Sequence, residues 1–332
     1  MEQFDDISKH VEKAQGDKAR FLKSKEGLLP HFEFPDKEAQ QEKQFSKETL
    51  LADMYEERID QMKKIMENPV FLGNICEYLQ DYATWGSEKK GKDIDNSFSA
   101  FQTLSALITT DTISRLSPEQ QNKINSYFEN PILLENAFRD LENNAIQSSK
   151  KELNEVTTLR APRALSALIT THALFSFSPE KQNRINSYFD NPILLENIYK
   201  YLRYNAMWGS EREGKDTEYA SWTFDTLSSL ITTNFFSRLS PEQQNEINSY
   251  FENPILLENA YRCLQNDAEL GFIRETAYMK NASWALQTLS SLVIVKDYLR
   301  EKGKKIDDEN FAKEALNPTE KIPPRPEGRL GK

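Results

Sequence analysis

The sequence predicts an all-α fold in which tandem three-helix repeats stack into a curved α-solenoid with helical caps. The dipeptide Asn-Pro recurs at residues 68, 130, 191 and 253, so that its spacing is 62, 61 and 62 residues. Three of these dipeptides stand in nearly identical text: SPEQQNKINSYFENPILLEN, SPEKQNRINSYFDNPILLEN and SPEQQNEINSYFENPILLEN. A chain of 332 residues with 11 Gly and 14 Pro also has too few turn residues for a β-sandwich or barrel. Self-similarity at such a period is typical of repeats that bury one another's apolar faces.

The first helix of each repeat is expected to begin at the Asn-Pro pair. Asn130 suits the N-cap, and Pro131 suits the first helical position, where its missing N–H costs nothing. An apolar stripe at helical spacing then follows in the second repeat. Its members are Leu134, Ala137, Phe138, Leu141 and Ala145.

Two more helices complete each repeat. The second contains the segment FQTLSALITT, whose apolar stripe is Phe101, Leu104, Leu107 and Ile108. The third opens at Ser117-Pro118, where Gln120 stands at the position that completes a capping box. Its expected buried face is Ile124, Tyr127 and Phe128. The next Asn-Pro pair ends this helix, because proline disfavours helical conformation in the residue before it.

These signals divide the chain into seven segments. Residues 1–45 are an N-terminal cap, 46–67 a capping helix, 68–129 repeat one, 130–190 repeat two, 191–252 repeat three, 253–317 repeat four with a C-terminal capping helix at 307–316, and 318–332 a proline-rich disordered tail. The text before Asn68 is a divergent half-copy of a third helix, with Met62, Ile65 and Met66 in its apolar positions.

Residues 46–317 resemble the armadillo and HEAT class of α-solenoids in having helical units that stack to form a groove. The resemblance is one of architecture. Units of 61 or 62 residues are longer than the roughly 40–47 residues of those families. The extra length falls between the first and second helices. The resemblance implies that a partner binds along the groove.

One asparagine per repeat is a candidate for contacting that partner. Asn74, Asn136, Asn197 and Asn259 stand midway along the four first helices. Armadillo proteins are similar in using one asparagine per unit to hydrogen-bond the backbone of an extended peptide, a task that suits an amide because it both donates and accepts. The alternative is that these asparagines bond to the neighbouring repeat.

A second candidate for partner binding is a long loop in repeats one and three. The loops begin at Trp85-Gly86 and Trp208-Gly209, continue through charged residues that include Lys92 and Lys215, and are missing from repeats two and four. Glycine after tryptophan suggests a helix C-cap, and tryptophan is a common interface anchor. Two equivalent loops suit a repeated or dimeric partner. The alternative is a tryptophan folded back onto its own helix.

Catalytic and metal motifs are not apparent in the sequence. His10, His31 and His172 are far apart, and His172 stands where other repeats have Asp111 and Asn234. The chain has no nucleotide-binding glycine loop, no GxSxG, no HExxH and no EF-hand loop. We therefore expect no catalytic residue, no cofactor and no metal. An enzyme whose site is built in the groove from divergent residues of repeat two, namely Glu155, Arg160 and Arg163, is the alternative.

Charge favours a protein partner over a nucleic acid. The net charge is −10, and phosphate binding requires a basic face, so nucleic acid is the least favoured ligand and a basic peptide suits better. With two cysteines, no apolar leader and no apolar run of about 18 residues, a cytoplasmic protein without membrane spans is expected. The Asn-, Lys- and Glu-rich duplicated sequence also suits a bacterial effector translocated into a host cell. The predicted function is a non-enzymatic protein-interaction scaffold of unknown oligomeric state.

Overall fold

The computed structural model describes residues 46–88, 94–150, 155–211, 213–215, 217–273 and 276–316. Within these ranges the chain forms twelve α-helices and three short 3-10 helices and contains no strand, which confirms the all-α prediction. None of these helices combines the length and the apolar character that crossing a bilayer requires.

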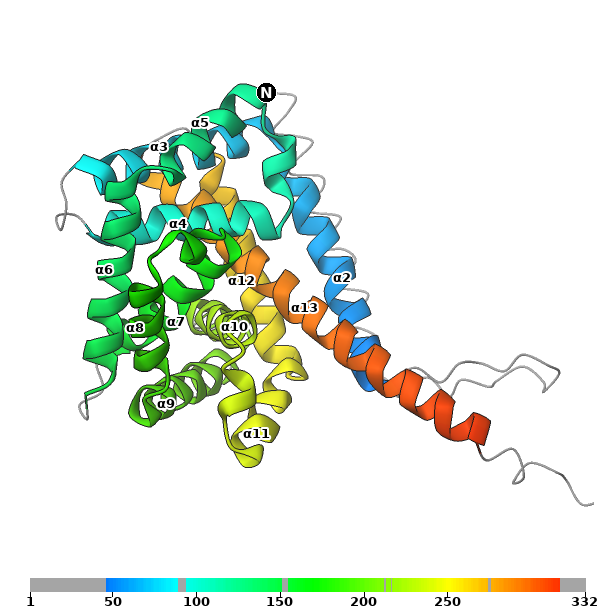
Figure 1. The fold of residues 1–332 in the computed structure, drawn as a ribbon. Coiled ribbons are helices and arrows are strands. Elements are labelled where there is room, and N and C mark those ends of the chain that lie inside the picture. Colours follow the sequence, from blue (N-terminus) through cyan, green and yellow to red (C-terminus); the bar gives the residue numbers. More distant parts are fainter. Residues whose placement is uncertain are drawn as a thin grey trace, which may run out of the picture. The chain divides into compact units, whose positions relative to one another are not determined.

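The helices follow one another in a regular order (Figure 1). The first is α2 (Lys47–Met66). Unit one contains α3 (Pro69–Glu88), α4 (Ile94–Thr109), the 3-10 helix η1 (Thr112–Arg115) and α5 (Pro118–Phe128). Unit two contains α6 (Pro131–Ser148), α7 (Glu155–Thr170), η2 (Ala173–Ser176) and α8 (Pro179–Phe189). Unit three contains α9 (Pro192–Gly209), α10 (Thr217–Thr232), η3 (Phe236–Arg238) and α11 (Pro241–Phe251), and unit four contains α12 (Pro254–Gly271) and α13 (Thr276–Leu316).

Proline and short polar residues set where these helices begin. The side chains of Asn130 and Ser117 each accept a hydrogen bond from a first-turn N–H, and a proline follows both. The capping box at Ser117 is complete, because Gln120 returns a hydrogen bond to the Ser117 N–H. The inner helices α4, α7 and α10 end near a residue in the left-handed region, respectively Asp111, His172 and Asn234, with φ of 57° to 58°. Asp, His and Asn tolerate that conformation better than most residues, which explains why His172 stands where it does.

The inner helices α4, α7, α10 and α13 form a closed ring of contacts. Each packs against the next, and α13 packs against both α10 and α4. The outer helices α3, α6, α9 and α12 do the same, since α12 contacts α3. Figure 1 shows the outer helices following one another around the inner ones. An open solenoid, the arrangement expected from the sequence, would leave the first and fourth units apart, and these contacts join them.

A hydrogen bond repeated in all four units joins each outer helix to the previous one. The Nδ2 atom of Asn136 donates to the Gly86 carbonyl at the end of α3, at 2.7 Å. The other three bonds, each 2.8 Å long, are Asn197 to Ser148, Asn259 to Gly209 and Asn74 to Gly271. The last of them closes the ring. We call this contact the asparagine latch, and it satisfies carbonyls that a helix end leaves without a helical partner.

In units one, three and four the residue that accepts the latch bond is a glycine, which allows a close approach of helices, and in unit two it is Ser148. A Cβ atom on Gly86 would lie 2.6 Å from Ser97 Oγ and 2.9 Å from Leu133 Cδ1, closer than such atoms approach. A Cβ atom on Gly271 would similarly meet Ala282 and Phe71 at 2.8 to 2.9 Å. Each glycine therefore lets its helix lie against both its own unit and the next.

Helix α2 lies against unit four, although it precedes unit one in the sequence. It packs on α12 and α13. Tyr55 of α2 donates its hydroxyl proton to the Phe251 carbonyl at 3.1 Å, and Tyr261 of α12 donates to the Tyr55 carbonyl at 3.2 Å. The segment before Asn68, expected to be a divergent half-copy of a third helix, thus lies against helices from the opposite end of the sequence.

The C-terminal capping helix expected at 307–316 is not a separate element. Helix α13 runs without interruption from Thr276 to Leu316. No Ser-Pro or Asn-Pro pair interrupts that stretch, so nothing starts a new helix. Gly303 instead allows α13 to touch α2, because a Cβ atom there would lie 2.3 Å from Thr49 Oγ1. Asp307 then accepts from the Ser46 N–H at 2.7 Å and from the Thr49 hydroxyl at 3.0 Å.

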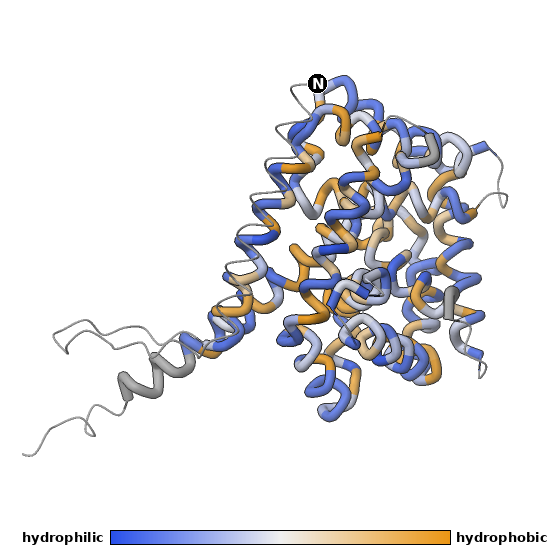
Figure 2. The backbone as a smooth tube through the Cα atoms, turned by 180° about the vertical axis from the view of Figure 1, so that it is seen from behind, coloured by the Kyte–Doolittle hydropathy of each residue, from blue (hydrophilic) through white to orange (hydrophobic). Residues whose placement is uncertain are grey.

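Apolar side chains fill the space between the inner and outer helices. In Figure 2, hydrophobic and hydrophilic residues alternate along the helices, as expected when each buries one face. The largest fully buried side chains include Tyr55, Phe71, Phe101, Phe189, Phe224 and Phe251. The rings of Tyr55 and Phe224 meet edge to face at 6.1 Å, which ties α2 to the inner helix α10. Ile108, expected in the core, is instead 38% exposed.

Removing the latch between the first and fourth units should destabilise the whole chain. We expect Asn74→Ala to lower the free energy of unfolding by about 1–3 kcal/mol, because it leaves the buried Gly271 carbonyl without a partner. Asn136→Ala should have a smaller effect, because the Gly86 carbonyl keeps its hydrogen bond from Ser97 Oγ, and Asn266→Ala, an exposed position on α12, should change the free energy of unfolding by less than about 0.5 kcal/mol. Urea unfolding measures all three. A wild-type midpoint for Asn74→Ala alone would mean that the ring is open.

Candidate functional site

The four asparagines predicted to bind a partner are buried inside the fold. Their exposed fractions are 5% for Asn74, 4% for Asn197 and 0% for Asn136 and Asn259. Each amide is engaged in the latch, and Asn259 also accepts from the Gly214 N–H at 2.7 Å. Asn136 is nearer the start of α6 than the expected midpoint, and its side chain faces the neighbouring unit. A peptide on the surface therefore could not contact these four side chains.

The two tryptophans lie on helices, whereas the sequence placed them at the start of loops. Trp85 is inside α3, which continues to Glu88, and Trp208 is the last residue but one of α9. The glycines that follow them serve close packing, and neither has a positive φ. Trp85 is 42% exposed, and Trp208 is half-buried. Lys215 is exposed, and Lys92 lies outside the described residues.

Aromatic side chains surround both tryptophans. In unit one, Tyr82 lies between Tyr78 and Trp85, with ring centroids 4.1 Å and 5.4 Å away. In unit three, Tyr219 of α10 lies within 6.4 Å of Tyr204, Trp208 and Trp222. We call these groups the unit-one corner and the unit-three corner. Each lies where the outer helix ends and the inner helix begins.

Every outer helix presents an exposed apolar side chain near its end, at one of two adjacent positions of the repeat. The last turn of each outer helix carries one, namely Trp85, Ile146, Met207 and Leu270, with exposed fractions of 42%, 42%, 58% and 37%. We call these four residues the apolar rim. Scattered apolar residues on a surface are ordinary, but an exposed apolar residue in the last turn of all four outer helices, with aromatic rings close by in units one and three, is the pattern of an interaction surface.

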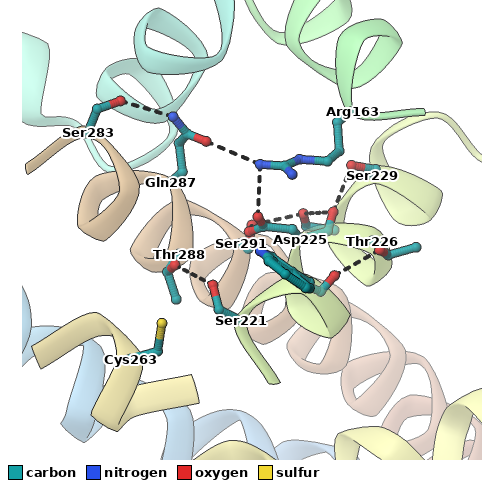
Figure 3. A network of polar contacts seen from close by, with 12 residues as sticks. Arg163, Ser221, Asp225, Thr226, Ser229, Cys263, Ser283, Gln287, Thr288 and Ser291 are labelled. Atoms are coloured by element: carbon teal, nitrogen blue, oxygen red, sulfur yellow. Dashed lines mark hydrogen bonds and ion pairs between the residues drawn. The ribbon is translucent and has the colours of Figure 1, made fainter. Parts of the chain in front are cut away.

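A second group of polar residues lies where the four inner helices meet (Figure 3). Its central members are Gln102, Arg163, Asp225 and Gln287, which occupy equivalent positions in the four units. Arg163 Nη2 lies 3.0 Å from Asp225 Oδ2 and 3.2 Å from Gln287 Oε1. When the Gln102 amide is oriented with its oxygen toward Arg163, that oxygen accepts a hydrogen bond from Arg163 Nε at 3.0 Å. We call this group the axial cluster.

Small hydroxyl residues surround the axial cluster. Ser291 donates to Asp225 Oδ1 at 2.8 Å, and Ser228 donates to Ser291 at 3.1 Å. The hydroxyl groups of Ser221 and Thr288 are hydrogen-bonded at 2.7 Å, as Figure 3 also shows. The cavity among these side chains has a volume of about 40 Å³, room for two or three water molecules. The arrangement can hold water, but it leaves no space for a larger substrate.

The chemistry of the axial cluster is that of a neutral, internally paired network. The Arg163 charge is matched by Asp225, and the same carboxylate accepts the hydrogen bond from the Ser291 hydroxyl. Of the residues in the enzyme alternative, only Arg163 lies here, since Arg160 pairs with Asp95 at 2.6 Å and the Glu155 side chain is outside the described part. Burial raises the pKa of Cys76 to about 11 and that of Cys263 to about 12, so both thiols stay protonated. In the described ranges, His, Cys, Asp and Glu side chains form no group suited to a metal.

The axial cluster was missed by motif reasoning, although the sequence contains a signal for it. Within closely similar inner helices, one position is Gln, Arg, Asp and Gln in turn. A position that alternates between charged and amide residues within otherwise similar apolar text is a candidate for a contact between units. Recognising this requires knowing that the ring is closed.

One buried carboxyl group stands apart from these networks. Asp140 of α6 is 1% exposed, and its Oδ2 atom has no hydrogen-bond partner. Burial, followed by the negative charge of Asp95, raises the pKa of Asp140 from 3.8 to about 7, while Arg160 and Asn144 act in the opposite direction. A carboxyl group with a raised pKa destabilises the fold once it ionises.

Removing one partner of the ion pair in the axial cluster should lower the free energy of unfolding more than replacing both partners. Asp225→Asn leaves the largely buried Arg163 charge unmatched, so we expect it to lower the free energy of unfolding by on the order of 3 kcal/mol. Arg163→Gln with Asp225→Gln, which repeats the residue of units one and four, should recover most of that loss. A double-mutant cycle by urea unfolding measures the coupling, and additive effects would contradict the pairing.

Asp140 should make stability depend on pH. Because its pKa is higher in the folded than in the unfolded chain, the folded state binds the extra proton, and stability falls as pH rises from about 4 to about 7. Asp140→Asn removes this dependence, so the variant should match the wild type near pH 4 and exceed it above pH 7 by up to about 4 kcal/mol. Denaturant unfolding at both pH values measures the difference. An equal difference in the free energy of unfolding between variant and wild type at the two pH values would exclude Asp140 as the cause.

No protein-family model, curated protein or solved structure matches this chain. The function proposed below accordingly rests on the chain's own residues, distances and charges. Of the two candidate sites, the apolar rim with its two corners is the one whose side chains reach solvent.

Proposed function

We propose that this chain is a non-enzymatic protein-interaction scaffold, made of tandem copies of one three-helix unit and binding a partner protein or peptide at the apolar rim. The observation that carries the proposal is the exposed apolar side chain at the end of every outer helix, with aromatic neighbours in units one and three. Tryptophan, tyrosine and methionine are enriched in protein interfaces. The closed ring replaces the groove of the predicted solenoid as the frame for binding.

The spacing of the two aromatic corners suggests the geometry of the partner. Units one and three are not neighbours in the ring of contacts, because unit two and unit four each lie between them. Two equivalent corners so arranged favour a partner that presents the same motif twice, such as a dimer. Binding at both corners would raise the overall affinity without a new kind of contact.

Charge supports a partner with basic residues. The chain has a net charge of −10. Exposed acidic residues stand beside the unit-three corner, namely Glu211 and Glu218. Basic residues on a partner would be attracted there, and a nucleic acid would be repelled by the same field.

The small size of the axial cavity weighs against the enzyme alternative. A volume of about 40 Å³ accommodates water but no organic substrate, and the paired charges offer no activated nucleophile. A scaffold needs neither. The proposed setting is the cytoplasm, either of the producing cell or of a host cell that receives the protein as an effector, since Cys76 and Cys263 are unpaired thiols.

Capture of a partner from cell lysate tests the proposal. The bait variant carries Trp85→Ala and Met207→Ala. These changes remove the rim residues of units one and three and leave the half-buried Trp208 in place. We expect partner recovery, read by quantitative mass spectrometry, to fall at least about tenfold. Phe175→Ala is the matched control, because Phe175 is a 68% exposed aromatic residue of η2, away from the rim. Circular dichroism should be unchanged for both baits. Equal recovery by the rim variant would exclude the rim as the binding surface.

A further inference from the structure

A contact between the outer helix and the third helix recurs in three units. In unit three, Glu196 Oε2 accepts a hydrogen bond from Gln243 Nε2 at 3.1 Å. In unit four, Glu258 Oε2 accepts from Arg58 Nη1 of α2 at 2.6 Å. In unit two, Glu135 pairs with Lys181. The three glutamates occupy one position of the outer helix, and the three donors occupy one position of the third helix.

Unit one has the donor but lacks the carboxylate. Its residue at the glutamate position is Gly73, and a Cβ atom built there would meet nothing within 4 Å. Gln120 stands at the donor position. Its Oε1 accepts from the Ser117 N–H at 2.9 Å, just as Gln243 Oε1 accepts from the Ser240 N–H at 3.0 Å. Gln120 is therefore held in the same orientation as a glutamine that binds a carboxylate.

The Nε2 group of Gln120 is left with a weak acceptor. It lies 3.7 Å from the sulfur of Cys76, and sulfur accepts hydrogen bonds poorly. In the matching contact of unit three, the acceptor is a charged carboxylate at 3.1 Å. The capping box therefore orients the Gln120 amide as a donor, and the position of the carboxylate that Gln243 contacts is open in unit one.

A cleft lies where the missing side chain would be. Its volume is about 490 Å³, and its lining residues are Glu67, Pro69, Leu72, Gly73, Arg115, Leu116 and Gln120. Arg115 forms an ion pair with Glu67, so these two charges cancel. Leu72 and Leu116 supply an apolar wall against which the methylene groups of a glutamate can pack. We call this the Gly73 cleft.

We propose that the Gly73 cleft binds the carboxylate of a glutamate side chain presented by a protein partner, with Gln120 Nε2 as its hydrogen-bond donor. The chain itself supplies the template, because three of its units fill the equivalent place with a glutamate. That the glutamate belongs to a partner protein rests on the proposed scaffold function. That the cleft binds a carboxylate rests on the contacts of the cleft alone. A partner of this kind would carry basic residues that face the acidic surface near the rim and one glutamate that enters the cleft.

The first test uses the full chain and a minimal probe, acetyl-glutamate methylamide. The side-chain amide signals of Gln120 and Gln243 are followed by ¹H–¹⁵N NMR and assigned through Gln120→Ala and Gln243→Ala. A single carboxylate contact predicts millimolar affinity. We expect the Gln120 signal to shift in a saturable way, and the Gln243 signal, already bonded to Glu196, to stay in place. Acetyl-glutamine methylamide, the uncharged match, should leave both unmoved.

The second test fills the cleft from within. Gly73→Glu should bring the Gln120 amide signal close to the position of the Gln243 signal and weaken probe binding at least about tenfold. Gly73→Ala is the matched control for helix propensity and should still bind the probe. Gly73 is exposed on α3, so these variants keep the fold.

Each outcome decides the matter. A silent Gln120 signal, an equal response to the glutamine probe, or undiminished binding by Gly73→Glu would overturn the cleft proposal. Loss of a captured partner in the rim variant together with a silent Gln120 would leave the scaffold standing without the cleft. A responsive Gln120 in a chain that captures no partner would establish the carboxylate site and remove its proposed protein carrier.

Discussion

The end of each outer helix leaves a buried carbonyl group that accepts a hydrogen bond from an asparagine of the next unit, and the rest of the structure depends on this contact. The asparagine latch makes this contact four times, and the fourth bond, from Asn74 to Gly271, joins the last unit to the first. A buried carbonyl without a partner is destabilising, so each unit requires its neighbour. Here the four units meet this requirement around a closed ring, in which each inner helix lies against the next and α2 packs on α12 and α13.

Closing the ring brings equivalent positions of similar helices face to face, and this limits what they can be. Four copies of arginine or of aspartate at the position of the axial cluster would repel one another. The observed set of Gln102, Arg163, Asp225 and Gln287 avoids that repulsion, because one positive and one negative charge are paired and two amides complete the bonding. The divergence of unit two is thereby explained as a requirement of packing. Gly73 is a different kind of divergence, because it removes an internal contact that the other units keep.

Local signals in the sequence predict the helices well, and they say little about how the units meet. The Ser-Pro and Asn-Pro pairs mark the starts of α5 and α6 because capping depends on neighbours in the chain. The period of 61 or 62 residues is the same for an open and a closed stack, so it could not reveal that Asn74 reaches Gly271. Spacing also could not decide whether an asparagine faces a groove or a neighbouring helix. The glycine after Trp85 suggested a helix end, whereas its role is to let two helices touch.

The place of α2 has a consequence for how the chain reaches its folded state. The hydrogen bonds from Tyr55 to Phe251 and from Tyr261 to Tyr55 join residues 196 and 206 positions apart. Contacts of such long sequence separation form late, because the loop between them must first be ordered. During synthesis α2 emerges before the unit that it completes, and its apolar face, which includes Ile59 and Met62, has no partner until α12 and α13 exist. The ring is therefore complete only after the last helix is made, and the earliest described helix is the one that waits longest for its place.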